Sequence, residues 1–311
     1  MTVSAAPADL FARESPDGSE SQSRRKRSRG GGPRAHGLAT ITTIYLLWSL
    51  VPVAVAILFS FNAGRSRSVW QGFSLRWYTW DPNGSILNDP ALRNALLHTI
   101  TLAIIATIIT VPLGVTFALA LDRWRGRVPT GASFAVLLSF VIPEIALAIG
   151  LLFLVTTLAT PFTLGTTAQL IGLITFQLSY PVVIVRARLL TIGTQYEEAA
   201  RDLGATALGA VRRVLLPMLT PAIMVSAILV FADVLDNFVI VRYLSADMST
   251  ETTSMRIYNT ARAAPTPALN ALATLILVTC LIVIVIGWLL YRRWSKGQGE
   301  AGGLGSFTST L

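Results

Sequence analysis

The chain has 311 residues, of which 53% are hydrophobic and only 13% are charged. Soluble domains carry about twice that share of charged residues, so the composition indicates a polytopic membrane protein. The formal net charge of +9 is also typical of proteins that bind nucleic acids. The placement of the charges along the chain decides between nucleic-acid binding and membrane topology as its cause. A single cysteine, Cys280, and two widely separated histidines, His36 and His98, exclude an intrachain disulfide framework and disfavour a cysteine or histidine metal site.

Six stretches are long and apolar enough to cross a bilayer, which needs about 20 helical residues. They are approximately 38–61, 95–121, 133–157, 169–190, 219–241 and 268–291. Lipid offers no hydrogen-bond partners to the backbone, so each stretch is expected to be an α-helix. A cleaved signal peptide is the competing interpretation of the first stretch, but it is too long and lacks a small-residue cleavage site. We therefore predict an all-α membrane protein with six transmembrane helices.

Arginine and lysine gather in four segments that fall on one side of this six-helix arrangement. They are the tail at 24–29, the loop at 122–127, the connection at 186–213 and the segment at 292–296. By the positive-inside rule both termini are expected to be cytoplasmic. The positive charge is thereby explained by topology, and we expect no nucleic-acid partner. Residues 1–37 and 296–311 are expected to be disordered tails, which leaves 38–295 as one transmembrane domain in the lipid bilayer.

The first loop on the opposite side is rich in aromatic residues. It contains Trp70, Trp77, Tyr78 and Trp80 within a short distance of the membrane. We interpret them as an interfacial aromatic belt rather than as a ligand site.

The connection at 192–217 is the most polar stretch inside the apolar region. Four residues spaced i, i+3, i+4, i+7 predict an apolar stripe on a short helix: Tyr196, Ala199, Ala200 and Leu203. Charged residues fill the other faces: Glu197, Glu198, Arg201 and Asp202. Gly204 permits a turn, and a second helical piece at about 207–215 should lead to Pro217 at the start of the fifth span. A short helix outside the membrane has no hydrophobic core of its own in which to bury this apolar stripe. It either lies on lipid or docks into another protein, and the acids disfavour an anionic lipid surface.

The order of residues in this connection resembles the EAA loop of ABC-importer permeases, written E-A-A-x3-G-x9-I-x-L-P. Here Glu198-Ala199-Ala200 is followed by Gly204 and then by Val214-Leu215-Leu216-Pro217, with Val214 as the one departure. The resemblance covers about 38–295 and implies the type I ABC-importer permease fold. It also implies an ATPase-coupling role for seven residues: Glu197, Glu198, Ala199, Ala200, Gly204, Leu216 and Pro217.

The same resemblance implies the partners of the chain. They are a second, similar permease, two ATP-hydrolysing subunits and an extracytoplasmic substrate-binding protein, at the bacterial cytoplasmic membrane. The chain contains no G-x4-G-K-[ST] phosphate-binding loop, so ATP and its magnesium are expected on the separate ATPase. We therefore expect a subunit that is not itself an enzyme and binds no cofactor.

Ionisable residues inside transmembrane spans are costly and are functional candidates by default. Glu144 lies near the middle of the third span, beside Pro143, which should loosen the helix and free a carbonyl. Asp233, Asp236 and Asn237 are spaced i, i+3, i+4, which places them on one helical face. Such an acidic, partly unwound pathway suits an organic cation. The alternative stays open that Asp236 and Asn237 are solvated helix-end residues and that Glu144 pairs with an arginine of a partner subunit.

Three further segments resemble the spermidine/putrescine branch of these permeases. They are "FVIPEIALAIGLLFL", "FADVLDNFVIVRYL" and "RIYNTARAAPTPALNALATLILV". Pro267 and Asn270 in the last segment also have a local explanation, because they stand at a helix start. The pair Asp236-Asn237 departs from the two acids expected in close polyamine relatives, which keeps ferric iron, aminophosphonates and opines open as substrates. A secondary transporter is disfavoured because no inverted repeat is evident, and a channel because no pore loop is evident.

Overall fold

A computed structural model describes residues 33–66, 68–82, 84–124, 127–157, 162–263 and 266–296. The chain divides into two compact units, 1–51 and 52–311, and each is considered by itself. Helix α1 (Pro33–Ser60) crosses the division and begins ahead of residue 38. The predicted disordered tails therefore lie for the most part outside the described residues.

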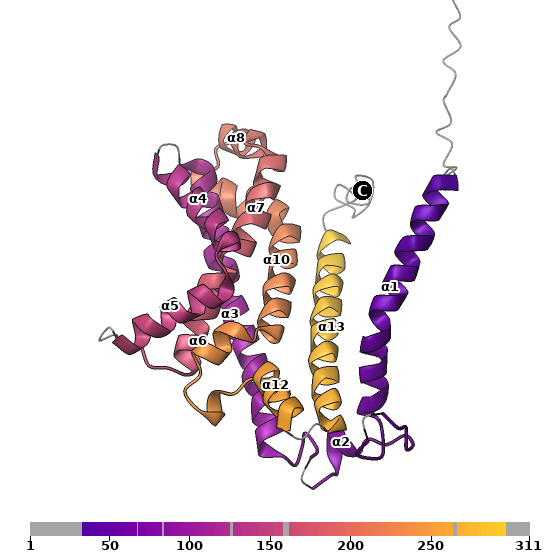
Figure 1. The fold of residues 1–311 in the computed structure, drawn as a ribbon. Helices are drawn as coiled ribbons and strands as arrows, with labels where there is room; N and C mark the ends of the chain where they lie inside the picture. Colours follow the sequence, from indigo (N-terminus) through magenta and orange to yellow (C-terminus); the bar gives the residue numbers. More distant parts are fainter. Residues whose placement is uncertain are drawn as a thin grey trace, which may run out of the picture. The chain divides into compact units, whose positions relative to one another are not determined.

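The described part of the chain is almost wholly helical (Figure 1). The long helices after α1 are α3 (Pro90–Arg123), α4 (Arg127–Val141), α5 (Glu144–Thr157), α6 (Thr166–Gln177), α7 (Ser179–Ile192), α10 (Leu216–Asp236) and α13 (Pro267–Lys296). The short ones are α2 (Arg76–Thr79), α8 (Gln195–Asp202), α9 (Ala207–Ala210), the π-helical η1 (Val211–Leu215), α11 (Val239–Tyr243), η2 (Met248–Thr250) and α12 (Thr253–Ala263). Five helical stretches are long and apolar enough to cross a membrane, or six if α4 and α5 count as one span. The predicted all-helical, six-span class is thus confirmed.

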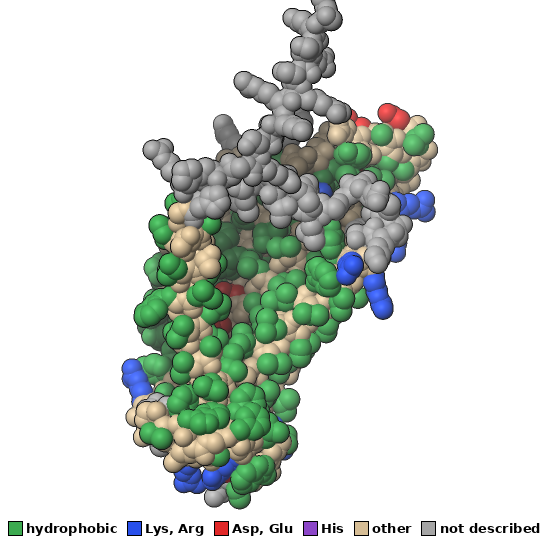
Figure 2. All heavy atoms as spheres, turned by 90° about the vertical axis from the view of Figure 1, so that its right-hand side faces the viewer, with side chains coloured by type: hydrophobic (Ala, Val, Ile, Leu, Met, Phe, Trp, Pro, Cys, Tyr) green, Lys and Arg blue, Asp and Glu red, His purple; other side chains and the backbone are tan. Residues whose placement is uncertain are grey.

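The core of the second unit lies where α3, α7 and α10 pack against one another. Its buried side chains include Leu102, Val115, Val182, Val185, Leu219 and Val230. The outward faces of the same helices stay apolar, as lipid-facing surfaces require. Figure 2 shows hydrophobic side chains over most of one face, with Lys and Arg toward its upper and lower parts.

The third span is not one helix, because α4 and α5 meet at an angle of 107°. Proline has no N–H to continue the helical hydrogen bonds. The last regular bond of α4 is therefore the one that the Ile142 N–H donates to the Leu138 carbonyl, at 2.9 Å. The Pro143 carbonyl then accepts from the Ala146 N–H at 2.9 Å and starts α5. Glu144, predicted near the middle of this span, is the first residue of the helix that follows the bend.

The prediction of a fifth span over 219–241 is wrong at both ends. The helix is continuous from Ala207, through α9 and η1, to Asp236. At Asn237 the backbone leaves the helical conformation, with ψ at 125°. The Asn237 side chain accepts from the Ile240 N–H at 3.2 Å, and this bond satisfies a donor at the start of α11.

The assignment of Trp77 to an interfacial belt is also wrong. Its side chain is 2% exposed and packs with Ile86, Leu92 and Leu272 in a small second core. The indole Nε1–H donates to the Asn62 carbonyl at 2.7 Å, as a buried tryptophan requires. Trp70 and Trp80 from the same loop remain exposed.

Helices α3 and α7 approach closely at Gly114. A Cβ at this position would lie 2.3 Å from Cγ of Pro181. Glycine is therefore required here by the closeness of the two helices, and the contact holds Pro181 against α3. Gly150 in α5 provides a contrast, because a Cβ there would meet nothing within 4 Å.

We predict that Gly114→Ala destabilises the protein by about 1–3 kcal/mol, the usual range for overpacking. The matched control Gly150→Ala should be neutral or slightly stabilising, because alanine is the better helix former by roughly 0.5–1 kcal/mol. Thermal unfolding of the detergent-solubilised protein measures both. Equal melting temperatures for the two variants would contradict the close approach.

Candidate functional site

Three interruptions of the helical ladder meet in one region of the second unit. They are the α4–α5 bend at Pro143, the junction of α6 and α7 at Leu178, and the break between α10 and α11 at Asn237. The elements around them are in contact, since α11 packs on α5 and α6 while α10 packs on α7. Irregular backbone at membrane depth is tolerated only where protein covers it or where it lines a cavity. A convergence of three breaks therefore marks this region as the candidate site.

Glu144 and Asn237 join two of these breaks. The Asn237 Nδ2 donates to Glu144 Oε1 at 2.5 Å. The backbone N–H of Ile240 also lies near the Glu144 carboxylate. The carboxylate at the start of α5 thus holds the chain where α10 gives way to α11.

Asp233 and Gln177 join the remaining break to α10. Gln177, the last residue of α6, is fully buried and donates from Nε2 to Asp233 Oδ2. Asp233 and Glu144 lie close enough to repel each other electrostatically. The sequence reasoning missed Gln177, although a polar residue within the apolar run "LITFQLSYPVV", four residues before Pro181, was a usable signal.

The carboxylates of the site are held by neutral amides and not by cations. None of the ion pairs among the described residues involves Glu144, Asp233 or Asp236. Asp236, at the end of α10, is exposed and lies near Asp233. No cation among the described residues therefore neutralises these carboxylates.

An aromatic pair stands beside the carboxylates. Tyr180 of α7 lies within electrostatic range of both Asp233 and Glu144. Phe140 of α4 packs edge-to-face on it, with ring centroids 5.4 Å apart. Carboxylates next to aromatic faces are suited to an ammonium group, which both kinds of group attract.

The predicted pathway residues are thus partly brought together. Two hydrogen-bonded pairs, Gln177 with Asp233 and Asn237 with Glu144, form one carboxylate cluster whose acids interact electrostatically. The expectation that Asp233, Asp236 and Asn237 lie on one helical face is wrong, because Asn237 lies beyond the end of the helix.

The predicted apolar stripe lies on α8 and is exposed. Tyr196 is 46% exposed and Leu203 is 90% exposed, and no residue of α8 is buried. The helix ends in a Schellman motif, in which the Ala205 N–H donates to the Ala200 carbonyl and the Gly204 N–H to the Arg201 carbonyl. Gly204 has φ of +88°, a conformation that side-chain-bearing residues rarely adopt.

Helix α8 is connected to the core in two ways. Glu197 forms an ion pair with Arg123 at the end of α3. Beyond Gly204 the chain re-enters a helix that runs through Leu216 and Pro217 into α10 without interruption. The π-helical turn η1 lies just before Pro217, whose missing N–H cannot serve the preceding turn. The predicted separate helical piece at 207–215 is therefore the beginning of the fifth span.

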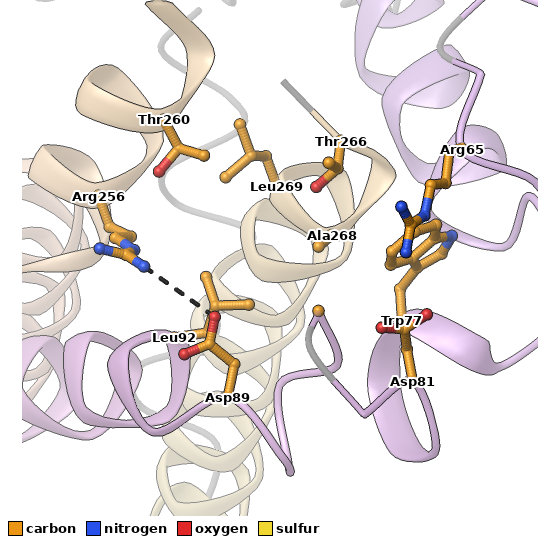
Figure 3. A pocket seen from close by; sticks show the side chains of 11 residues that line it. Arg65, Trp77, Asp81, Asp89, Leu92, Arg256, Thr260, Thr266, Ala268 and Leu269 are labelled. Carbon is orange, nitrogen blue, oxygen red and sulfur yellow. Dashed lines mark ion pairs between the residues drawn. The ribbon is translucent and has the colours of Figure 1, made fainter. Parts of the chain in front are cut away.

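A second hollow, of about 360 Å³, lies near α2, α12 and the first turn of α13 (Figure 3). Arg65 and Arg256 face it together with Asp81 and Asp89. Arg256 lies 4.0 Å from Asp89 and 3.4 Å from Glu251. Charges of both signs offset one another here, unlike in the carboxylate cluster.

Comparison with known proteins identifies relatives along most of the chain. Residues 110–296 match the family described as binding-protein-dependent transport system inner membrane component. The spermidine/putrescine transport system permease protein PotC of Escherichia coli K12 is 33% identical over 83% of this chain and 94% of its own. The putrescine transport system permease protein PotI of the same strain is 34% identical over 79% of this chain and 87% of its own.

Solved structures share the fold. A bacterial alginate ABC transporter, in complex with a pentasaccharide-bound periplasmic protein, aligns with a TM-score of 0.67 at 17% identity, over 83% of this chain and 93% of that chain. The MetNI methionine ABC transporter aligns with a TM-score of 0.55 at 20% identity, over 66% and 96%. At these identities the likeness concerns the fold alone.

We predict that Glu197→Gln loosens α8 from α3, because it removes the ion pair with Arg123. Exposed pairs contribute about 0.2–1 kcal/mol, so hydrogen exchange in α8 should quicken by up to about fivefold. Glu198→Gln is the matched control, since no ion pair among the described residues involves Glu198. The charge-swapped double variant Arg123→Glu with Glu197→Arg should restore slow exchange, and identical exchange in both single variants would refute the tether.

Proposed function

The chain belongs to the family of binding-protein-dependent transport system inner membrane components and is a permease subunit of an ABC importer; we propose that it imports a polyamine. Substrate would arrive on an extracytoplasmic binding protein and cross by alternating access. A partner subunit would hydrolyse ATP, so this chain would form part of the substrate's path across the membrane and would not catalyse the hydrolysis.

The cluster of Glu144, Asp233 and Asn237 is the observation that carries the substrate proposal. Its carboxylates are held by amides, so an incoming cation meets unneutralised negative charge. Burying a charge without a partner is costly, and a substrate that brings the opposite charge removes part of that cost. Asp236, exposed beside the cluster, would extend the acidic path to its entrance.

The two relatives named for spermidine and putrescine, or for putrescine alone, support the same substrate class. Both polyamines are flexible chains with several protonated amines, which suits a path that offers acids and aromatic faces in series. Ferric iron, aminophosphonates and opines serve as comparison substrates.

Helix α8 would be the docking element for the ATPase. Its exposed stripe of Tyr196, Ala199 and Leu203 is an apolar surface that no other described residue buries, and Glu198 would set its register. Leu216 and Pro217 stand where this segment passes into α10. The α8 end would face the cytoplasm, and a second permease with two ATPase subunits would complete the transporter.

The experiment that tests the function is the ATPase activity of the purified complex in a bilayer with its binding protein. Putrescine and spermidine are titrated against ferric iron, an aminophosphonate and an opine. Stimulation by the polyamines alone is expected. Stimulation by another of these solutes instead would overturn the polyamine proposal.

We predict that Glu198→Lys and Gly204→Val uncouple transport from ATP hydrolysis. The first reverses a charge on the docking helix, and the second strains the turn at φ +88°. Uptake should fall at least about tenfold while the amount of protein in the membrane is unchanged. Thr191→Val, on the exposed side of α7, is the control, and normal uptake in both loop variants would sink the docking role.

We predict that Glu144→Gln and Asp233→Asn lower polyamine uptake by about tenfold or more, because each removes one negative charge while keeping the shape. ATPase coupling should persist in part. Asp247→Asn changes an exposed carboxylate between α11 and α12 and should leave uptake unaltered. If neither cluster variant changes uptake, the acids are structural.

A further inference from the structure

Gln177 stands at the junction of α6 and α7, where one regular backbone hydrogen bond cannot form. In a regular helix the Gln177 carbonyl would accept from the N–H four residues on, but that residue is Pro181, which has none. Helical hydrogen bonds form on both sides of this position. The Leu178 N–H donates to the Ile174 carbonyl at 3.0 Å, and the Val182 N–H donates to the Leu178 carbonyl at 3.4 Å. One carbonyl oxygen is therefore released at this position.

Packing holds Pro181 in place at this junction. Pro181 is buried against Gly114 of α3, where even a Cβ would collide with its ring. Pro181 consequently has no room to move toward α3, and the carbonyl of Gln177 stays outside the helical ladder.

The side chain of Gln177 carries a second acceptor without a partner. Its Nε2 donates to Asp233, but its Oε1 is buried and accepts no hydrogen bond from any described residue. The side chain as a whole is 0% exposed. A buried carbonyl oxygen without a donor is unfavourable, and it persists where a ligand or a second state supplies the donor.

Gln169, in the same helix, shows what a structural glutamine looks like here. It is equally buried, and its Nε2 donates to the carbonyls of Val241 at 3.0 Å and Thr250 at 2.9 Å. Its Oε1 lies 2.9 Å from His98 Nε2. Every polar atom of that amide is thus used, whereas Gln177 keeps an acceptor free beside a carboxylate.

We propose that Gln177 binds the substrate directly, accepting an N–H from one protonated amine of the polyamine while Asp233 balances its charge. The inference rests on the proposed function and names a residue that selects for N–H-bearing cations. A metal ion fits less well, since within the described part of the chain no group of three or more His, Cys, Asp or Glu is placed to hold one.

The cluster offers two carboxylates to a diamine, Asp233 beside Gln177 and Glu144 beside Asn237. One ammonium would lie at Gln177 and Asp233, and the other at Glu144, which Asn237 orients.

The test measures equilibrium binding to the complex in nanodiscs without the binding protein, whose own selectivity would otherwise dominate. The ligands are putrescine and its fully N-methylated analogue, which has the same charge but no N–H. Wild-type protein should prefer putrescine by about tenfold or more. Gln177→Met, similar in size but without the amide, should bind putrescine about tenfold more weakly and lose the preference.

The control is Thr175→Val, on the exposed side of α6, where the Thr175 hydroxyl bonds only to the Ile171 carbonyl of its own helix. It should keep the wild-type preference. If Gln177→Met does not reach the membrane, Gln177→Asn takes its place, because it withdraws the amide by one methylene and should also reduce the preference. A role confined to packing would lower the amount of folded protein without changing the ratio of the two affinities.

The two proposals fail in different ways. An unaltered preference in the Gln177 variants, or no preference in wild type, overturns the role of Gln177 even when polyamine uptake depends on Glu144 and Asp233. Absence of polyamine-stimulated ATPase activity and uptake in wild type, with the binding protein present, overturns the proposed function and with it this inference.

Discussion

The arrangement of this protein depends on how backbone polar groups are satisfied where helices break in apolar surroundings. Lipid cannot provide the missing hydrogen bonds, so each break needs a side chain or a ligand close by. At the α10–α11 break, Asn237 and Glu144 meet this need together. At the α6–α7 junction, the Gln177 side chain donates a hydrogen bond to Asp233, but its Oε1 accepts none from the described residues. The polar groups that allow the chain to break are thereby the groups that a charged solute would meet.

The continuity of α9, η1 and α10 connects the two functional regions mechanically. Roughly 40 Å of helix separates Ala207 from Asp233 at about 1.5 Å per residue. Because a helix transmits displacement along its axis, a push on α8 would reach the carboxylate cluster through this element. The ion pair of Glu197 with Arg123 gives α8 a second connection, through α3, which also holds Pro181 through Gly114.

Local patterns in the sequence were sufficient for much of the fold. The apolar runs predicted the spans because a bilayer requires a minimum helix length, and the i, i+3, i+4, i+7 spacing predicted the exposed stripe on α8. Gly204 predicted a turn, and the structure places it at positive φ. Pro143 predicted a loosened helix, although the 107° bend exceeds that expectation. In each case the cause lies within a few residues of the chain.

Features that depend on contacts between distant segments were decided only by the tertiary structure. From the sequence Trp77 is interpreted as an interfacial residue, but in the structure residues of α13 cover it. From the sequence Asn237 is predicted to be part of a helix. In the structure it follows the end of α10 and donates a hydrogen bond to Glu144, far earlier in the chain. The local pattern marks Gln177 as a polar residue in an apolar run but does not show its role, because that role comes from Asp233 on another helix and from a proline held by Gly114. The sequence by itself thus determined the membrane class, the apolar spans and the exposed stripe of α8, which follow from hydropathy and short-range spacing. The carboxylate cluster required packing, because hydrogen bonds across helices depend on which residues become neighbours.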